Sequence, residues 1–231
     1  MGAYSLPQWV HLCFTTDGAV FLDTRRDKYF GLDYQKAQLL LRVLERDAAA
    51  MTAEHVELAQ ELHTSGLLTP SHDATCPPFS AAAIAPPDAL LCEPDDLPER
   101  ITLLQVARFV AACCATWVAF HLGSLDHAVV RLKRRKARLL KRGSSNDLDR
   151  TRELICAFFR LRTFVYTADD HCLFDSLVAA DYLQRFGVSS TCVFGVRTLP
   201  FAAHCWVQTN GHLVTDSSLE QLRAFSPIFT I

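Results

Sequence analysis

The last third of the chain contains a helix-like segment followed by strand-like segments, and this order constrains the fold more than any other feature. Apolar residues at helical spacing predict a helix over Cys172–Phe186, and Gly187 is well placed to end it. Alternating residues predict a strand over Ala202–Thr209, and Asn210–Gly211 is a strong signal for a hairpin into Gly211–Asp216. A helix next to an antiparallel pair of strands predicts an α+β domain.

Three residues on these segments have the types that nucleophilic acyl chemistry requires. Cys172 opens the helix, where unpaired N–H groups and the helix dipole favour a thiolate. His204 lies in the strand and Asp216 follows one hairpin later, so an imidazole can shuttle a proton while a carboxylate orients it. This is the chain order of papain-like and transglutaminase-like sites. From the residues alone, each also has a structural interpretation: a buried thiol, a core histidine and a turn aspartate.

The register of the hairpin decides whether Asp216 can face His204. A two-residue turn at Asn210–Gly211 would leave their side chains on opposite faces of the sheet. A three-residue loop with Gly211 in the left-handed conformation would place Asp216 directly across from His204, with Cβ atoms ~4.5–5.5 Å apart. We therefore predict this loop, or an equivalent bulge in either strand.

Composition and charge narrow the class of protein. The 231 residues suit one large domain or two small ones, and 50% hydrophobic content supplies a core. An odd number of cysteines, nine, together with the lack of a signal-peptide pattern, favours reduced thiols in the cytoplasm. The net charge of −2 argues against a general binder of nucleic acid or anionic membranes. No second pair of ligands has zinc-like spacing, so we expect no metal. We also expect no cofactor.

Residues 1–72 have the pattern of a small winged-helix-like domain of three strands and two to three helices. The predicted strands and helices, in order, are Val10–Phe14, Val20–Asp23, Lys28–Leu32, Tyr34–Arg46 and Thr52–Ser65. Thr52 is the expected N-cap of the last helix and Gly66 its expected stop.

Residues 73–98 are rich in proline and alanine and predict an extended linker rather than core, which leaves 99–231 as a helix-rich second domain. We expect Ile101–Leu122 to be a buried helix, with a membrane span as the alternative, because its uninterrupted apolar part is too short to span a ~30 Å hydrocarbon core. The helical region continues to Arg142 with a break near Gly123–Ser124, and a helix capped by Asp147 or Asp149 follows. Eight of the twelve residues 131–142 are basic, which fits either a solvated helix face or a dock for an acidic partner.

Two parts of the chain resemble known families. The segments HCLFDSLVAADYLQRFG, VFGVRTLPFAAHCWVQTNGHLVTD and FSPIF, within 170–231, resemble the lasso-peptide biosynthesis B proteins. These are leader peptidases built on a transglutaminase-like cysteine protease fold with an antiparallel sheet. The segment VHLCFTTDGAVFLDTRRDKYFGLDYQKAQLLLRVL is similar to the domain with which enzymes that modify ribosomal peptides hold a leader.

The resemblance implies a catalytic triad of Cys172 as nucleophile, His204 as general base and then acid, and Asp216 as the orienting residue. It implies a ribosomal precursor peptide as substrate, whose leader is cut away to free the amine of the core. An ATP-dependent, asparagine-synthetase-like partner would then close that amine into a macrolactam. We expect Cys205, next to the histidine, to face away from the site.

The first domain is expected to bind the leader along an exposed edge strand, because an extended peptide can add to such an edge. The helix Thr52–Ser65 would form the other wall of the groove. The residues expected to bind the leader are Arg25, Arg26, Lys28, Tyr29, Phe30, Gly31 and Leu32.

Two other functions remain compatible with the sequence. A transglutaminase or acyltransferase would use the same thioester chemistry but transfer the acyl group to an amine. A catalytically inactive adaptor would only carry the leader. Partners that involve nucleic acid or membrane insertion are not expected.

Overall fold

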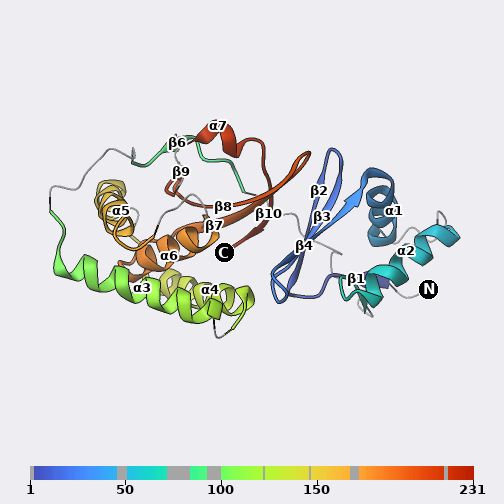
Figure 1. The fold of residues 1–231 in the computed structure, drawn as a ribbon, viewed down its shortest axis with the longest axis horizontal. Coiled ribbons are helices and arrows are strands. Elements are labelled where there is room, and N and C mark those ends of the chain that lie inside the picture. Colours follow the sequence, from blue (N-terminus) through green and yellow to red (C-terminus); the bar gives the residue numbers. More distant parts are fainter. Residues whose placement is uncertain are drawn as a thin grey trace. The chain divides into compact units, whose positions relative to one another are not determined.

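The computed structural model is a mixed α+β structure of helices and mainly antiparallel sheets (Figure 1). It describes residues 3–45, 51–71, 84–92, 100–121, 123–145, 147–166, 172–215 and 218–231. The chain forms two compact units. The first comprises residues 1–83, 195–203 and 226–229, and the second comprises 84–194, 204–225 and 230–231.

The first unit is built around an antiparallel sheet in the order β2-β3-β4. Its strands are β2 (Val10–Thr15), β3 (Gly18–Asp23) and β4 (Lys28–Asp33), so the three predicted strands are confirmed. All six residues of β3 are buried, because this strand lies between the other two. Strand β4 forms hydrogen bonds with β3 along one side only, which confirms it as an edge strand of this sheet.

Two helices cover this sheet. They are α1 (Tyr34–Glu45) and α2 (Ala53–Thr64), and the apolar face of each enters the same core cluster as β2 and β3. Thr52 is the N-cap of α2, where its N–H donates to Nδ1 of His55, and Gly66 has a φ of +80° just past the end. The sequence pattern missed a further pair of short strands, β1 (Ala3–Ser5) and β5 (Thr69–Ser71).

A second sheet has the order β10-β7-β8-β9-β6. Its strands are β7 (Thr191–Thr198), β8 (Phe201–Thr209), β9 (His212–Leu213), β10 (Ser226–Thr230) and β6 (Ala89–Leu90). Strand β6 pairs in parallel with β9, and Leu91 and Cys92 after it are buried. The proline-rich segment is therefore not only a linker, because residues 84–92 add a strand to this sheet. A short helix, α7 (Leu219–Leu222), precedes β10.

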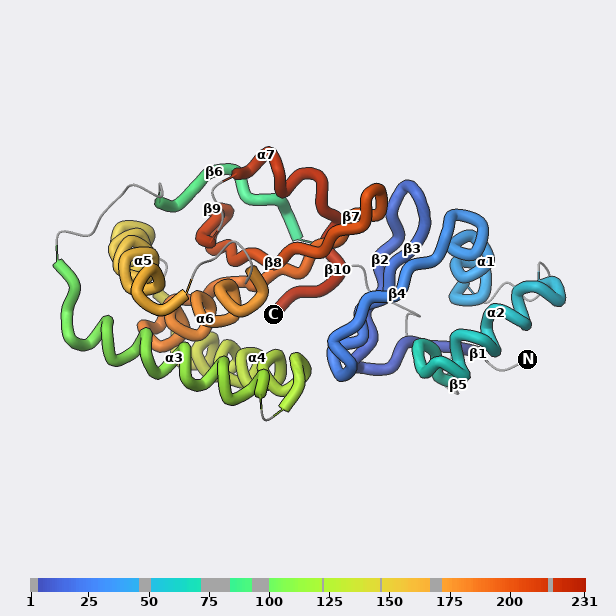
Figure 2. The backbone as a smooth tube through the Cα atoms, in the orientation of Figure 1, coloured from blue at the N-terminus to red at the C-terminus, as the bar shows by residue number. Residues whose placement is uncertain are grey.

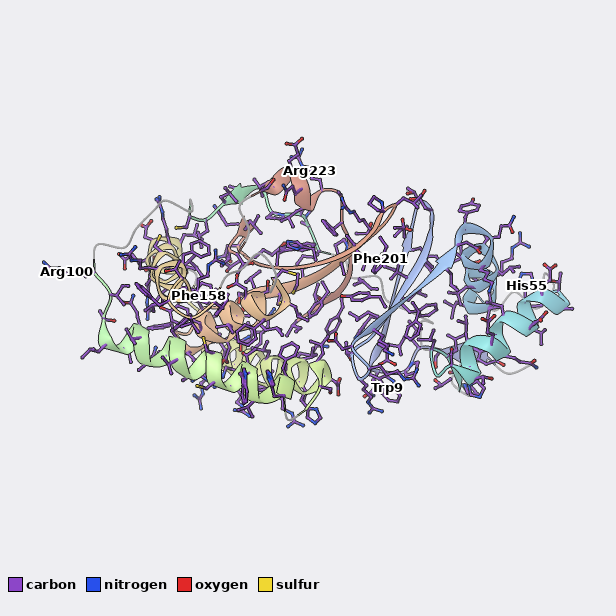
Figure 3. The ribbon with its side chains drawn as sticks, in the orientation of Figure 1. Trp9, His55, Arg100, Phe158, Phe201 and Arg223 are labelled. Atoms are coloured by element: carbon purple, nitrogen blue, oxygen red, sulfur yellow. The ribbon has the colours of Figure 1, made fainter. Side chains whose placement is uncertain are left out.

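The remaining helices surround one central helix, α6 (Cys172–Arg185), whose residues 175–184 are all buried. Helices α3 (Leu103–His121), α4 (Leu125–Arg142) and α5 (Leu148–Arg162) pack against it (Figure 2). Phe158 of α5, labelled in Figure 3, packs between Phe109 of α3 and Tyr182 of α6, with ring centroids 5.7 Å from each. Asp147 caps α5 by accepting the N–H of Arg150, and Gly187 ends α6 with a φ of +83°.

Helix α3 differs from the buried helix that its composition predicted. Only Phe109, Ala112 and Thr116 are buried, all on the stripe that faces the core. The opposite stripe exposes large apolar side chains, among them Leu103 and Trp117. Within the described residues, α3 is the one helix long and apolar enough to cross a membrane by length and composition, with a mean hydropathy of 1.7. The periodicity of α3 could not reveal this exposure, because both of its faces are apolar.

Candidate active site

Cys172 is the first residue of α6 and is hydrogen-bonded to the side chain of His204 on β8. This hydrogen bond lowers the pKa of the Cys172 thiol below its ordinary value, and the lowering prevails over burial, which acts in the opposite direction. Both residues are half-buried. The structure thus brings together two of the three residues predicted to be catalytic.

Backbone amides add to the effect of the imidazole. The N–H groups of Cys205 and Leu173 hydrogen-bond the Cys172 sulfur and favour its thiolate form. Helix α6 is held against β8 one turn further on, where the Ser176 hydroxyl donates to the carbonyl of Cys205 at 2.8 Å. Cys205 therefore contributes both of its backbone polar groups to this junction, which fixes the thiol relative to the strand that carries His204.

Aromatic residues enclose the His204 imidazole. Its ring stacks with Trp206, at a centroid distance of 6.2 Å, and packs against Phe225 at 5.4 Å. The Trp206 indole N–H donates to Gln208, whose amide donates in turn to the carbonyl of Ala85. These contacts place His204, Trp206 and Gln208 on one face of β8, and they restrict the rotation of the His204 ring.

The hairpin after β8 does not have the predicted three-residue loop. Residues Thr209 and His212 pair across a two-residue turn, in which Asn210 has a φ of +47° and Gly211 a φ of +79°. Gly211 is left-handed as expected, but Gln208 pairs with Leu213, which is the register of a two-residue turn. The loop prediction is therefore wrong. A two-residue turn with both central residues at positive φ is the preferred connection for Asn-Gly.

The regular ladder ends before it reaches residue 216. Val214 donates its N–H to the carbonyl of Val207, but the N–H of Val207 goes to the side-chain hydroxyl of Thr215 at 2.9 Å. In a continued ladder that N–H would bond the carbonyl of Val214. Because the chain leaves the ladder here, the register does not fix the face of the following residues. Asp216 itself lies outside the residues that the structure describes.

The neighbouring thiol, Cys205, points away from the site, as predicted. Its sulfur is buried 3.4 Å from the sulfur of Cys192 on β7. Burial and the adjacent Cys192 raise the pKa of the Cys205 thiol, so it stays protonated where Cys172 ionises more readily.

A buried carboxylate beneath Cys172 was not predicted from the sequence. Asp175, in the first turn of α6, accepts from Arg162 at 2.6 Å and from the Tyr166 hydroxyl at 2.9 Å. Burial and this carboxylate raise the pKa of Tyr166, which keeps its hydroxyl a hydrogen-bond donor. The three residues anchor the start of α6 to the end of α5. An aspartate in the first turn of a largely apolar helix, three positions after the cysteine, was the available signal.

The residues expected to bind a leader lie on and beside β4 in the first unit. Lys28 and Gly31 are exposed on this edge strand, and Tyr29, Phe30 and Leu32 are half-buried. Tyr29, Leu32 and Phe201 are among the residues that line a cavity of about 390 Å³ within the same unit.

The two arginines before β4 have partners within the first unit. The Arg25 guanidinium lies 3.4 Å over the ring of Trp9. Arg26 donates to the carbonyl of Ser65 at 2.7 Å, which places the end of α2 beside the β3–β4 turn. Both arginines remain exposed to solvent.

No group of three or more His, Cys, Asp or Glu side chains within the described ranges is arranged to hold a metal ion. The eight cysteines in those ranges are free thiols. The chemistry that this geometry supports is that of a thiolate nucleophile with an adjacent imidazole for proton transfer.

The chain matches the transglutaminase-like superfamily over residues 114–230, about half of its length. No curated protein and no solved structure matches it. The matched range includes Cys172 and His204 and most of the elements that position them. This chain belongs to the transglutaminase-like superfamily.

Proposed function

We propose that the chain is a cysteine endopeptidase of the lasso-peptide biosynthesis B type, which hydrolyses the bond between leader and core of a ribosomal precursor. The observation that carries the proposal is the Cys172 thiol at the N-terminus of α6, hydrogen-bonded to His204 and with a lowered pKa. The superfamily provides the thioester chemistry, and the resemblance of 170–231 to the leader peptidases provides the substrate class.

In this proposal the Cys172 thiolate attacks the carbonyl carbon of the last leader residue. The His204 imidazolium donates its proton to the leaving nitrogen, so that the free α-amine of the core departs and the leader stays bound as a thioester. His204 then takes a proton from water, which attacks the thioester, releases the leader carboxylate and restores the thiol. We assign to Asp216 the role of orienting the imidazole. The released amine is the group that an asparagine-synthetase-like partner would join to a side-chain carboxylate.

Incubation of the protein with a synthetic precursor peptide of the lasso-peptide type tests the reaction, with mass spectrometry of the products. We expect two fragments whose summed mass exceeds that of the precursor by one water. Transfer of the leader to an added amine such as putrescine, in place of water, would identify an acyltransferase. An uncleaved but bound precursor would identify an adaptor.

The open edge of β4 provides the binding site that we propose for the leader. Thr24, directly after β3, donates its N–H to the carbonyl of Trp9 on the β2 side, so the alternating residues Leu22 and Val20 also face β2. Gly31 is the partner of Val20 across the β3–β4 pair and therefore directs its own N–H and C=O toward the open edge. An extended leader that pairs with β4 would bond these groups and place apolar side chains near Tyr29 and Leu32.

Gly31→Pro is expected to weaken leader binding about ten-fold or more, because it removes one edge donor and its ring obstructs the approaching strand. Gly31→Ala is the matched control. A Cβ at this position would meet no atom within 4 Å, so its affinity should stay close to that of the wild type. Isothermal titration calorimetry with a synthetic leader measures both, and circular dichroism verifies the fold. Equal affinities for the two variants would exclude strand addition at β4.

A further inference from the structure

Helices α3 and α4 form a hairpin with an unusual charge. Residues 103–142 contain nine Lys and Arg but a single acidic residue, Asp126, although the whole chain has a formal net charge of −2. The net charge of the whole chain therefore does not show that this hairpin is strongly cationic.

Each of the two helices has one face in the core of the second unit and an opposite face in solvent. Both pack against α6, α3 through Phe109 and Ala112 and α4 through the stripe that contains Leu125 and Leu132. Their opposite stripes therefore both point away from α6, and the helices lie along one another in Figure 1. Arg131 of α4 joins them, since its guanidinium donates to the Thr116 hydroxyl of α3.

The outer stripe of α3 is apolar. The exposed residues at alternating spacings of four and three are Leu103, Ala107, Val110, Cys114, Trp117 and His121. Leu103 is 89% exposed and Trp117 51%, and the Trp117 ring stacks on His121 at 4.1 Å. Monomeric soluble proteins rarely expose an apolar stripe of this length without a partner for it.

The outer face of α4 is basic, and α4 packs along α3. His127, Arg131, Arg134 and Arg138 are among the residues that line a groove of about 480 Å³ along the helix. Arg131 and Arg135 also bind the buried Asp181, but Arg134 and Arg138 are exposed. An apolar stripe that contains a tryptophan, next to a row of arginines, has the chemistry of an interfacial helix on anionic lipid.

We propose that the outer face of the α3–α4 hairpin binds the surface of an anionic lipid bilayer. The apolar side chains of α3 enter the boundary between headgroups and acyl chains, and the arginines of α4 bind lipid phosphates. The hairpin lies on the bilayer and does not cross it, because Phe109 and Ala112 of α3 belong to the folded core. A partner helix would also cover the α3 stripe, but it would leave the row of cations on α4 unexplained.

Co-sedimentation of the full chain with lipid vesicles tests this proposal. We expect binding to vesicles of phosphatidylcholine mixed with phosphatidylglycerol, little binding to phosphatidylcholine alone, and loss of binding in ~1 M salt, where the Debye length falls to ~3 Å. Arg134→Glu/Arg138→Glu should weaken binding at least ~10-fold. Arg42→Glu/Arg223→Glu, which makes the same change in net charge at exposed sites outside the hairpin, should retain it.

A second pair of variants tests the apolar stripe. Leu103→Gln/Trp117→Gln should also weaken binding to the mixed vesicles, without a change in oligomeric state measured by light scattering. Equal binding of the wild type and the Arg134→Glu/Arg138→Glu variant would overturn the proposal. So would a wild-type dimer that the Leu103→Gln/Trp117→Gln variant lacks, because the stripe would then be an interface between two copies of the chain.

Discussion

Replacement of Cys172 by alanine is expected to lower the rate of precursor cleavage by at least ~10³-fold, because positioning alone cannot replace a nucleophile. Leader affinity should not change, since the proposed leader site lies on β4 in the other compact unit. Cleavage is measured by chromatography of the precursor and its fragments, and affinity by calorimetry with the leader. Cys114→Ala, which removes an exposed thiol of α3, is the control and should cleave normally.

His204→Ala should reduce cleavage to a similar extent, and it allows a second readout that does not depend on the substrate. The hydrogen bond from His204 is the largest cause of the lowered thiol pKa, so its loss should raise the pKa of Cys172. The pH midpoint for alkylation of Cys172 by iodoacetamide should therefore move upward in the variant, as followed by mass spectrometry of the modified peptide. A Cys172→Ala protein that still cleaves at a comparable rate, or an unchanged midpoint in His204→Ala, would contradict the assignment.

The pairing of Cys172 with His204 could be predicted because it depends on features that a sequence displays directly. The apolar periodicity places the cysteine at the start of a helix, and the alternating strand gives the face of the histidine. The N-terminal sheet was predictable for the same reason, since short local turns connect its strands in chain order. Local patterns were sufficient to place each of these residues on its helix or strand.

The register after β8 could not be predicted from strand parity. The parity argument assumed that the ladder continues as far as Asp216, and it therefore required an extra residue in the loop. The structure keeps the two-residue turn, and the Thr215 hydroxyl takes the N–H of Val207 in place of a backbone carbonyl. Alternation along a strand carries no information on where a side chain replaces the backbone as acceptor.

Contacts between distant and short segments were also missed. Strand β6 has two residues and pairs with β9, more than a hundred positions later, so neither propensity nor periodicity indicates it. The exposure of α3 was missed because an all-apolar helix does not show which stripe faces the core. Composition alone therefore assigned residues 84–92 to the linker and α3 to the interior.

The basic run of α4 contains a buried feature that charge patterning did not reveal. Asp181 of α6 is completely buried and accepts hydrogen bonds from Arg131 and Arg135 of α4 and from Arg185 of α6. From the sequence, these arginines were indistinguishable from the solvated ones beside them. Asp181 lies fifty positions after Arg131, and its ion pairs with Arg131 and Arg135 keep both guanidinium groups partly buried.

Asp181→Asn is expected to lower the free energy of unfolding of the second unit by about 3–5 kcal/mol, because it removes the carboxylate that neutralises three partly buried guanidinium groups. Arg134→Met, which removes an exposed arginine of the same helix, should change it by no more than ~0.5 kcal/mol. Arg185→Met should lower the free energy of unfolding by less than Asp181→Asn does, because it reduces the excess of positive charge around the Asp181 carboxylate.

Urea unfolding followed by tryptophan fluorescence measures these differences. A Trp9→Phe background leaves Trp117 and Trp206, which both lie in the second unit, as the reporters. The fluorescence then follows the unfolding of the second unit, and an unfolding transition of the first unit does not contribute to it. If Asp181→Asn and Arg134→Met had the same small effect, the arginines would be solvated well enough to need no counter-ion. The attachment of α4 to α6 would then depend on its apolar stripe alone.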